Sequence, residues 1–510
     1  MKKFSLLIFS SLLILFSLAQ EWKPVSGKIL TPWAEKVNPA APLPEYPRPH
    51  MVRKDWTNLN GLWQYSILPK DQQAIPASMQ GSILVPFAVE SALSGVGKTV
   101  GKDSVLWYKK TVSVLRTSNK TVLLHFGAVD WQCTVFVNGQ EAGKHQGGYD
   151  PFAIDITKAL KSGSRQEIAI RVWDPSDDGP QPRGKQVKRP HSIWYTPVTG
   201  IWQTVWVETV PQTYIASTKQ TPDIHENSLQ VAAQVQNIQQ GDVLRVIALD
   251  GANKIAEQTV SGNETTLNIA NPKLWSPSSP FLYTLKLAVL RRGKVVDEVE
   301  SYFAMRKISM SPDKNGIQRM MLNNQFVFQY GPLDQGWWPD GLYTAPTDEA
   351  LKFDIEKTRE MGFNMIRKHV KVEPARWYRY CDEMGMLVWQ DMPSGDLGNR
   401  WEPRPGIIGR GTDKARTPES ETIFRTEWNE IMQDLHNFPC IVVWVPFNEA
   451  WGQFKTKEIV NWTMQKDSSR LVNTASGGNF EAVGHIIDLH NYPDAAMPDH
   501  DDFDLPLLVT

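Results

Sequence analysis

Cysteine is scarce in this chain, which has three among 510 residues, at Cys133, Cys381 and Cys440. A sparse and odd count argues against a framework of disulfides, and no spacing of Cys and His is typical of a zinc site. We therefore expect buried free thiols, with one pair left open, and we assign no metal ligands and no cofactor.

Net charge is also nearly absent, since 54 Lys and Arg stand against 55 Asp and Glu, a formal net charge of −1. A near-neutral chain offers no basic field for nucleic acid or for anionic membrane surfaces. Beyond the N-terminus no apolar run reaches the roughly 18 residues that a membrane-spanning helix needs. We expect no nucleic-acid partner and no membrane span.

The N-terminus has the pattern of a secretory signal peptide. Met1-Lys2-Lys3 is positive, residues 4–16 are apolar, and Ser17-Leu18-Ala19 has the small residues of a cleavage site. We predict a signal peptide over residues 1–19 with Gln20 as the first mature residue. The protein is then expected to be exported, to the periplasm or outside the cell.

Tryptophan, by contrast, is abundant, at 20 residues against 13 Tyr. The broad apolar face of indole suits stacking on the C–H faces of sugars, although most Trp in any large protein lies in the core. The composition therefore favours a carbohydrate ligand only weakly. The length leaves room for about three or four domains.

The chain divides by its pattern of strands and helices. Residues 20–50 are rich in Pro and predict an extended arm, which we join to a β-sandwich domain over residues 20–210. The strands expected there are short and turn-bounded, and one ends on Asn138-Gly139, a strong hairpin signal. Residues 211–308 repeat this pattern at a length that suits an immunoglobulin-like sandwich.

From residue 309 to residue 510 strands alternate with helices, which predicts a parallel sheet and a (β/α) barrel. The strands are expected at residues 325–330, 364–367, 386–390, 440–447, 471–475, 486–489 and 505–509. Helices are expected to start at Thr347 and Thr417, as N-caps, and to cover residues 374–384 and 454–465. The region is shorter than the roughly 250 residues of a complete barrel, so we expect an incomplete one.

The most informative stretch runs from Cys440 to Gly452. Its uncharged, β-branched run is typical of a strand that is buried on both faces, and it leads directly into Asn448-Glu449. Barrel enzymes keep their chemistry at the carboxyl ends of their strands. Glu449 is therefore the first candidate for a catalytic side chain.

Several motifs, in order, resemble glycoside hydrolase family 2, the family of β-galactosidases, β-glucuronidases and β-mannosidases. The resemblance covers nearly the whole mature chain, and it lies in the order and spacing of the motifs together. It implies a jelly-roll sugar-binding domain, an immunoglobulin-like domain and a catalytic TIM barrel. The motifs are Trp56-x-x-Leu59-Asn60-Gly61-Leu62-Trp63, Gly148-Tyr149-Asp150-Pro151-Phe152, Gly200-Ile201-Trp202-Gln203, Leu274-Trp275-Ser276-Pro277, Gly362-Phe363-Asn364-Met365-Ile366-Arg367, Val388-Trp389-Gln390-Asp391 and Asn448-Glu449.

The resemblance implies that Glu449 is the general acid/base of a retaining glycosidase and that Asn448 binds the sugar 2-hydroxyl. Such an enzyme needs an acid with a raised pKa and an ionised carboxylate about 5–5.5 Å away as nucleophile. The family keeps that glutamate at the end of strand seven, after a run such as residues 506–510. We expect it to follow Thr510, and the resemblance supports neither Asp391 nor Asp488 in its place.

Further substrate-binding candidates follow from the barrel positions that match the family. Arg367 and Asp391 are expected to orient the catalytic carboxylates or to form a structural ion pair. The other candidates sit at strand ends or on the rim, where packing is the alternative to sugar contact. They are His369, Trp451, His490, Tyr492, Trp337 and Trp338.

Two functions remain open on the sequence. The first is an exported retaining β-glycosidase that hydrolyses terminal β-linked sugars of oligo- or polysaccharides. The second is a truncated, non-catalytic carbohydrate-binding protein. Both have a carbohydrate as partner, and the sequence leaves the sugar, the linkage, any metal dependence and the oligomeric state open.

Overall fold

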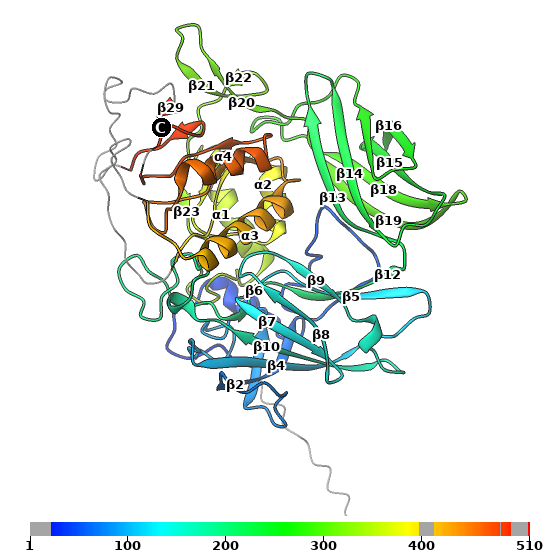
Figure 1. Cartoon of the computed structure of the whole chain (residues 1–510), viewed down its shortest axis with the longest axis vertical. Helices are drawn as coiled ribbons and strands as arrows, with labels where there is room; N and C mark the ends of the chain where they lie inside the picture. The colour runs from blue at the N-terminus through cyan, green and yellow to red at the C-terminus, as the bar shows by residue number, and fades with distance from the viewer. Residues whose placement is uncertain (1–21, 397–412, 480, 491–507, 510) are drawn as a thin grey trace, which may run out of the picture.

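The structure is a computed structural model that describes residues 22–396, 413–479, 481–490 and 508–509. The signal peptide predicted over residues 1–19 lies outside these residues. Figure 1 shows three bodies: a blue-to-cyan β-sandwich, a green β-sandwich, and a yellow-to-red domain of helices and parallel strands. No described helix is both long enough and apolar enough to cross a membrane.

The first sandwich, preceded by an arm with a short helix η1 (Pro32–Lys36), packs two antiparallel sheets around an aliphatic core. The four-stranded sheet has the order β1 (Trp56–Asn58), β12 (Val205–Pro211), β5 (Lys120–Phe126) and β9 (Phe152–Asp155). The six-stranded sheet has the order β3 (Gly81–Val85), β2 (Gly61–Pro69), β4 (Ser104–Ser113), β10 (Arg165–Trp173), β7 (Gln132–Val137) and β8 (Gln140–Gln146). Smaller elements are β6 (Val129–Asp130), β11 (Gly200–Ile201), η2 (Thr157–Ala159) and η3 (Ser176–Asp178).

The hairpin predicted at Asn138-Gly139 is present and joins β7 to β8. Both residues have positive φ, +52° and +83°, as a type I′ turn requires. The twist of that turn matches the twist of the paired strands, which is why the dipeptide is a strong local signal.

The second sandwich has a three-stranded and a four-stranded antiparallel sheet, as expected of an immunoglobulin-like domain. The first sheet has the order β13 (Tyr214–Asp223), β14 (Ser228–Gln236) and β17 (Glu264–Asn268). The second has the order β16 (Asn253–Val260), β15 (Asp242–Asp250), β18 (Tyr283–Arg291) and β19 (Lys294–Phe303). Between the sheets lies a core of its own, separate from that of the first sandwich.

The barrel domain holds a parallel sheet of five strands with helices between them. The order follows the chain: β23 (Leu333–Asp334), β24 (Met365–Lys368), β25 (Leu387–Asp391), β26 (Ile441–Val445) and β27 (Leu471–Val472). The helices are α1 (Asp348–Glu360), α2 (Ala375–Met384), α3 (Pro418–Leu435) and α4 (Thr456–Lys466). A separate parallel pair is formed by β28 (Ile486–Ile487) and β29 (Leu508–Val509).

The helix starts in this domain agree with the sequence. Thr347 Oγ1 accepts a hydrogen bond from Ala350 N at 3.1 Å, and Thr417 Oγ1 accepts one from Ser420 N at 3.1 Å. Each threonine therefore satisfies an amide that the first helical turn leaves free. The strand predicted before Asn448 is also present, and all five residues of β26 are buried, as expected for a strand covered on both faces.

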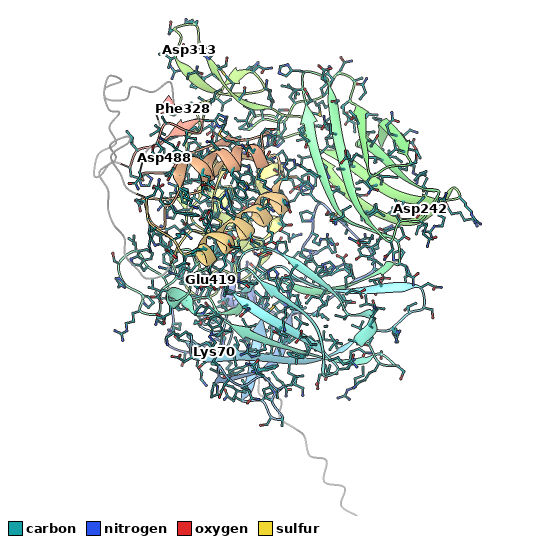
Figure 2. The ribbon with its side chains drawn as sticks, in the orientation of Figure 1. Lys70, Asp242, Asp313, Phe328, Glu419 and Asp488 are labelled. Carbon is teal, nitrogen blue, oxygen red and sulfur yellow. The ribbon has the colours of Figure 1, made fainter. Side chains whose placement is uncertain are left out.

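The first strand of the barrel domain was predicted in the wrong place, at residues 325–330. Asn323 and Asn324 both have positive φ and form a turn, so that β22 (Gln325–Phe326) pairs antiparallel with β21 (Gln318–Leu322), beside β20 (Ile308–Pro312). Phe328, labelled in Figure 2, is exposed. The parallel sheet begins instead at Leu333, because the two asparagines turn the chain back before it can enter the sheet.

The sandwich and the barrel domain are in contact along α3. Glu419, labelled in Figure 2, lies in the first turn of this helix, and the neighbouring Ser420 Oγ donates to Pro180 O at 3.0 Å. Trp131 Nε1 donates to Glu427 Oε1 at 2.9 Å in a buried contact. The first sandwich is therefore placed against the domain that carries Glu449.

Candidate active site

The carboxyl ends of β24, β25 and β26 bring together side chains that are far apart in the chain. Arg367 lies on β24, Asp391 is the last residue of β25, and Asn448 follows β26. Because parallel strands end at the same edge of a sheet, these three polar side chains meet there. The sequence predicted each of them at this edge, and the structure brings them together.

Arg367 is the centre of this group. Its Nε and Nη2 donate to Asp391 Oδ1 and Oδ2 at 3.0 and 2.8 Å, and Nη2 also donates to Asn448 Oδ1 at 2.9 Å. Burial, the largest single influence, favours a raised pKa for Asp391, but the charge of Arg367 together with the contacts to Arg367 and His369 brings the pKa below its ordinary value. The pair is therefore charged in the folded protein.

The bond from Arg367 fixes the orientation of the Asn448 amide. Since Oδ1 accepts from the guanidinium, the Nδ2 group points the other way, and it donates to Glu449 Oε2 at 3.3 Å. An amide nitrogen held beside the carboxylate can donate to a sugar hydroxyl. This is the geometry that the expected role of Asn448 requires.

Glu449 stands at the turn that leaves β26. Glu449 and Ala450 both have left-handed backbone conformations, with φ of +50° and +57°, and Glu449 N donates to Ser476 O at 2.7 Å. The turn holds the side chain partly exposed instead of burying it. Backbone strain of this kind is concentrated at functional sites.

The pKa of Glu449 differs from the expected one. His490 Nδ1 donates to Glu449 Oε1 at 2.8 Å, and this hydrogen bond, against the smaller effect of burial, lowers the pKa below its ordinary value. A raised pKa was predicted for the acid/base. The prediction fails here because the surrounding groups that act on the carboxylate, His490 and Lys185 among them, are donors or cations.

His490 is held by a small network that the sequence did not reveal. His490 Nε2 lies 2.8 Å from Ser476 Oγ and 3.3 Å from Arg367 Nη1. Ser476 Oγ in turn donates to Asp488 Oδ1 at 2.8 Å. Gly477 is required beneath the ring, because a Cβ there would come within 2.3 Å of His490. Asp488 thus holds Ser476, and through Ser476 it helps to position His490.

His369 is fully buried beside the ion pair. Its Nδ1 lies 3.4 Å from Asp391 Oδ2, and burial lowers its pKa to about 4, so the ring is neutral at neutral pH. At 2% exposure, His369 is placed behind Asp391, where it packs against the ion pair.

The three tryptophans expected on the rim lie in packed surroundings. Trp451 is 3% exposed and packs edge-on against Trp194 of the first sandwich, with ring centroids 5.0 Å apart. Trp338 is 8% exposed and packs edge-on against Trp33 of the arm. Trp337 is half-buried and lies against Tyr195 at 4.4 Å. Of the three tryptophans, Trp337 is the most exposed. Tyr492, the remaining aromatic candidate, lies outside the described residues.

A buried ionic network beside the site was also missed. Lys368 Nζ donates to Asp334 Oδ2 at 2.7 Å and to Glu373 Oε1 at 2.9 Å, and Lys371 Nζ donates to the same Glu373 oxygen at 2.8 Å. The alternation of side chains along β24 is the sequence feature that could have indicated this network, because Arg367 and Lys368 must face opposite sides of the strand. Lysines in the sequence do not show by themselves which of them will be buried.

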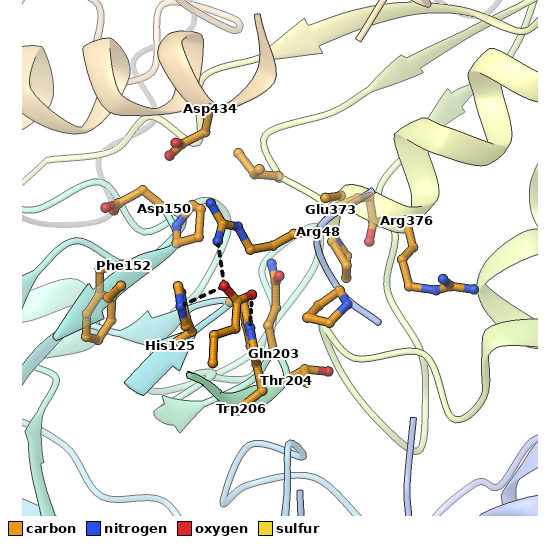
Figure 3. A pocket seen from close by; sticks show the side chains of 18 of the residues that line it. Arg48, His125, Asp150, Phe152, Gln203, Thr204, Trp206, Glu373, Arg376 and Asp434 are labelled. Carbon is orange, nitrogen blue, oxygen red and sulfur yellow. Dashed lines mark hydrogen bonds and ion pairs between the residues drawn. The ribbon is translucent and has the colours of Figure 1, made fainter. Parts of the chain in front are cut away.

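A large cavity lies elsewhere, where the two sandwiches and the barrel domain meet. Its volume is about 600 Å³, and neither Glu449, Asn448 nor Asp391 lines it. Figure 3 shows Arg48, His125 and Trp206 joined by dashed lines to one carboxylate, that of Glu208. We place the candidate active site at Glu449, because the carboxylate with its Asn448, His490 and Arg367–Asp391 neighbours lies there and not in the cavity. No cluster of His, Cys, Asp and Glu in the described part of the chain is arranged to hold a metal ion.

Three models of one family match successive parts of the chain. The sugar-binding domain of glycosyl hydrolases family 2 matches residues 56–211, the central family 2 domain matches residues 213–306, and the family 2 TIM barrel domain matches residues 344–504. The chain belongs to glycosyl hydrolase family 2. The resemblance read from the motifs and the predicted combination of two sandwiches with an incomplete TIM barrel are confirmed.

Relatives in family 2 carry the names of two activities. A protein of Formosa agariphila named "Putative beta-glucuronidase" is 30% identical over 77% of this chain and 46% of its own length. A β-galactosidase of Thermoanaerobacter pseudethanolicus is 27% identical over 68% of this chain and 45% of its own. The chain therefore spans less than half the length of these two relatives.

Solved structures share the fold. A β-glucuronidase from Ruminococcus gnavus superposes with a TM-score of 0.70 at 20% identity, covering 88% of this chain and 78% of its own. At that identity the likeness shows that the fold is the same. The function of this chain is argued from its own site.

Proposed function

We propose that this chain acts as an exported retaining β-glycosidase that hydrolyses terminal β-linked sugars of oligo- or polysaccharides, with Glu449 as general acid/base. The observation that carries the proposal is the position of Glu449 at the carboxyl end of β26. There its carboxylate lies within hydrogen-bonding distance of Asn448 and His490, beside the Arg367–Asp391 pair.

Glu449 would act twice in this reaction. In the first step its proton passes to the glycosidic oxygen as the bond from that oxygen to the anomeric carbon breaks. In the second step its carboxylate takes a proton from the water that attacks the anomeric carbon. The nucleophile of the first step is proposed to be a second carboxylate about 5–5.5 Å away. We assign it to none of the residues that the structure describes.

Asn448 is proposed to donate from Nδ2 to the sugar 2-hydroxyl. Arg367 supports this role because it occupies the amide oxygen, and the nitrogen, which gives one hydrogen to Glu449, has its second hydrogen left for the sugar. A contact to the 2-hydroxyl that strengthens at the transition state contributes to the rate. The names of the relatives suggest a β-glucuronide or a β-galactoside as substrate.

The test replaces Glu449 by alanine. We expect hydrolysis of substrates with poor leaving groups to fall about 10²–10⁴-fold, since acid assistance is lost. Aryl glycosides with good leaving groups need no such acid, and added azide should accelerate their turnover by attacking the anomeric carbon, giving a glycosyl azide of retained configuration. The matched control is Glu458→Ala on the exposed face of α4, which should keep full activity. Unchanged activity in Glu449→Ala would refute the assignment.

A non-catalytic carbohydrate-binding protein is the second candidate, and one observation favours it. His490 lowers the pKa of Glu449, whereas a general acid at neutral pH needs a raised one. A nearby carboxylate nucleophile would raise it. Saturable sugar binding without any turnover of activated aryl β-glycosides would select this second function.

Export also stands as a proposal. It rests on the positive, apolar and small-residue segments within residues 1–19. Expression in a secreting bacterial host should release a protein whose N-terminus is Gln20. A secreted fraction that retains Met1 would contradict it.

A further inference from the structure

The cavity between the two sandwiches and the barrel domain has no part in the proposed reaction. Its volume of about 600 Å³ lies within the range of roughly 300–1,000 Å³ that is typical of small-molecule sites. All three domains contribute apolar side chains to its wall, among them Trp202, Ile215 and Leu435. The few polar groups that reach this space therefore decide which ligand it can hold.

The charges on the wall are not balanced. Three arginines line the cavity, and each of them forms an ion pair with a carboxylate. The pairs are Arg48–Glu208 at 3.4 Å, Arg53–Asp297 at 2.6 Å and Arg376–Asp348 at 2.7 Å. By contrast, the side chains of Asp434 and Glu45 also line the cavity, and among the described residues neither has a hydrogen bond or an ion pair. The wall thus has negative charge to spare.

Asp434 is the carboxylate best placed to meet a ligand. Figure 3 shows it reaching from α3 into the cavity, and its side chain is exposed to that space. It lies in the last turn of α3, where the helix dipole is negative and the turn itself has no basic residue. Enclosure by the walls, together with the negative charges of Asp150 and Glu430, raises its pKa. A cation in the cavity would relieve this repulsion.

Gln203 faces the same space from the first sandwich. The residue is only 8% exposed, yet within the part of the chain that the structure describes its side chain makes no hydrogen bond. Figure 3 shows it on the wall of the cavity, and a Cβ at Gly127 would come within 2.8 Å of its Oε1, so glycine is needed beside it. A buried amide without a partner is costly, and a ligand with an N–H group would satisfy its oxygen.

We propose that this cavity binds a linear aliphatic amine of the polyamine class, with an ammonium group on Asp434, an N–H group on Gln203 and the methylene chain along the apolar wall. A neutral ligand would leave the spare carboxylates without a partner, and an anion would be repelled by them. No residue of the candidate active site takes part, so the proposal is independent of the glycosidase reaction.

The test uses three probes of one chain length and different charge. They are spermidine, 1,8-diaminooctane and octane-1,8-diol. Dissociation constants are measured by calorimetry at pH 8, where primary amines still carry their protons. The proteins are the wild type, Asp434→Asn, Gln203→Met and the control Glu419→Gln. The control removes a carboxylate from the first turn of the same helix, outside the cavity.

We expect the wild type to bind both amines and to bind the diol far more weakly. Asp434→Asn should weaken binding of the amines about 10- to 100-fold, the range of one charge-assisted hydrogen bond. Gln203→Met should weaken it about 3- to 10-fold, and Glu419→Gln should leave it unchanged. Equal affinity for the diamine and the diol would overturn the proposal. Equal losses in Asp434→Asn and Glu419→Gln would overturn it too, because the attraction would then be diffuse.

A further variant tests the place of binding. Ala153 lines the cavity and is exposed, so Ala153→Trp should fold and should obstruct the space without removing a charge. We expect it to abolish binding of both amines, and spermidine should no longer raise its midpoint of urea unfolding as it does in the wild type. Full affinity in Ala153→Trp would place the amines elsewhere and overturn the proposal. Glu449→Ala should bind spermidine as the wild type does, whatever its effect on hydrolysis.

Discussion

At the scale of the residue, one hydrogen bond lowers the pKa of Glu449. His490 Nδ1 lies 2.8 Å from Oε1, and the ring is itself held by Ser476. The lowered pKa that results favours the ionised carboxylate at neutral pH. The proposed role as general acid needs a raised pKa, which a negative charge beside Glu449 or the loss of the His490 contact would favour.

The first prediction replaces His490 by alanine. Because His490 lowers the pKa of Glu449, its removal should raise that pKa. Activity that needs protonated Glu449 should then persist to higher pH, so the alkaline limb of kcat/KM against pH should move upward. NMR titration of ¹³C-labelled glutamate, with Glu449→Gln to assign the signal, follows the same change without turnover.

The control for this change is His191→Ala, an exposed histidine of the first sandwich. It should leave both the alkaline limb and the titration curve where they are. A His490→Ala protein whose Glu449 titrates at the wild-type pH or below would contradict the role given to His490.

The sequence alone was enough to predict the site residues that follow strands. It was not enough to predict the residues that reach the site from distant segments of the chain. Glu449, Asn448 and Asp391 follow buried apolar runs, so a strand-end rule and the family motifs were enough to find them. Ser476 carries no such local signal. It reaches the site through its contact with His490, which depends on packing and not on local pattern.

At the scale of the element, the Arg367 guanidinium ties the neighbouring strands together. It lies on β24, and its partners Asp391 and Asn448 lie on β25 and just after β26. Each partner is buried, so loss of the arginine would leave a charge without compensation inside the domain. The structure therefore contains the ion pair, one of the two alternatives for these residues, while their role in orienting catalytic carboxylates stays a prediction.

The second prediction is that Arg367→Met destabilises the protein by about 3–5 kcal/mol, the usual cost of breaking a buried ion pair from one side. Equilibrium unfolding in urea at pH 7 measures it. Adding Asp391→Asn to the same protein should recover part of the loss, since the orphaned charge is removed. The control Arg319→Met breaks a more exposed pair with Asp313 and should cost at most about 1 kcal/mol. A loss for Arg367→Met no larger than the control would contradict this account.

Element boundaries show where local rules succeed. Thr347 and Thr417 cap α1 and α3 as predicted, because a side-chain oxygen before a helix satisfies a free amide within three residues. The prediction of a barrel strand at residues 325–330 was wrong, because apolar residues alone do not distinguish a strand of a hairpin from a strand of a barrel. The turn at Asn323-Asn324 places residues 325–326 in a hairpin, and the two asparagines are the sequence feature that indicates it.

At the scale of the whole molecule, the first sandwich and the barrel domain share a buried acidic interface along α3. Glu427 Oε1 accepts from Trp131 Nε1 of the sandwich, and Glu427 faces Asp150 of the same sandwich. Burial, followed by the negative charge of Asp150, raises the pKa of Glu427 well above its ordinary value. We therefore expect the docking of the first sandwich onto the barrel domain to depend on the protonation of Glu427.

The third prediction follows from the sign of that shift. With its pKa raised in the folded state, Glu427 binds more protons when folded than when unfolded at pH values between its unfolded pKa of about 4.3 and its folded pKa. Its contribution to stability is complete below that pH and is lost as pH rises toward the folded pKa. Glu427→Gln keeps an acceptor for Trp131 but cannot titrate. The slope of unfolding free energy against pH should therefore become less negative by up to about 1.4 kcal/mol per pH unit.

Urea unfolding of the wild type and of Glu427→Gln at intervals from pH 5 to pH 8 measures this difference. Glu419→Gln, in the exposed first turn of the same helix, should leave the slope of the wild type unchanged. Parallel stability curves for the wild type and Glu427→Gln over this range would mean that Glu427 ionises in place. The interface would then tolerate a buried negative charge beside Asp150, and docking of the two domains would not depend on pH through this residue.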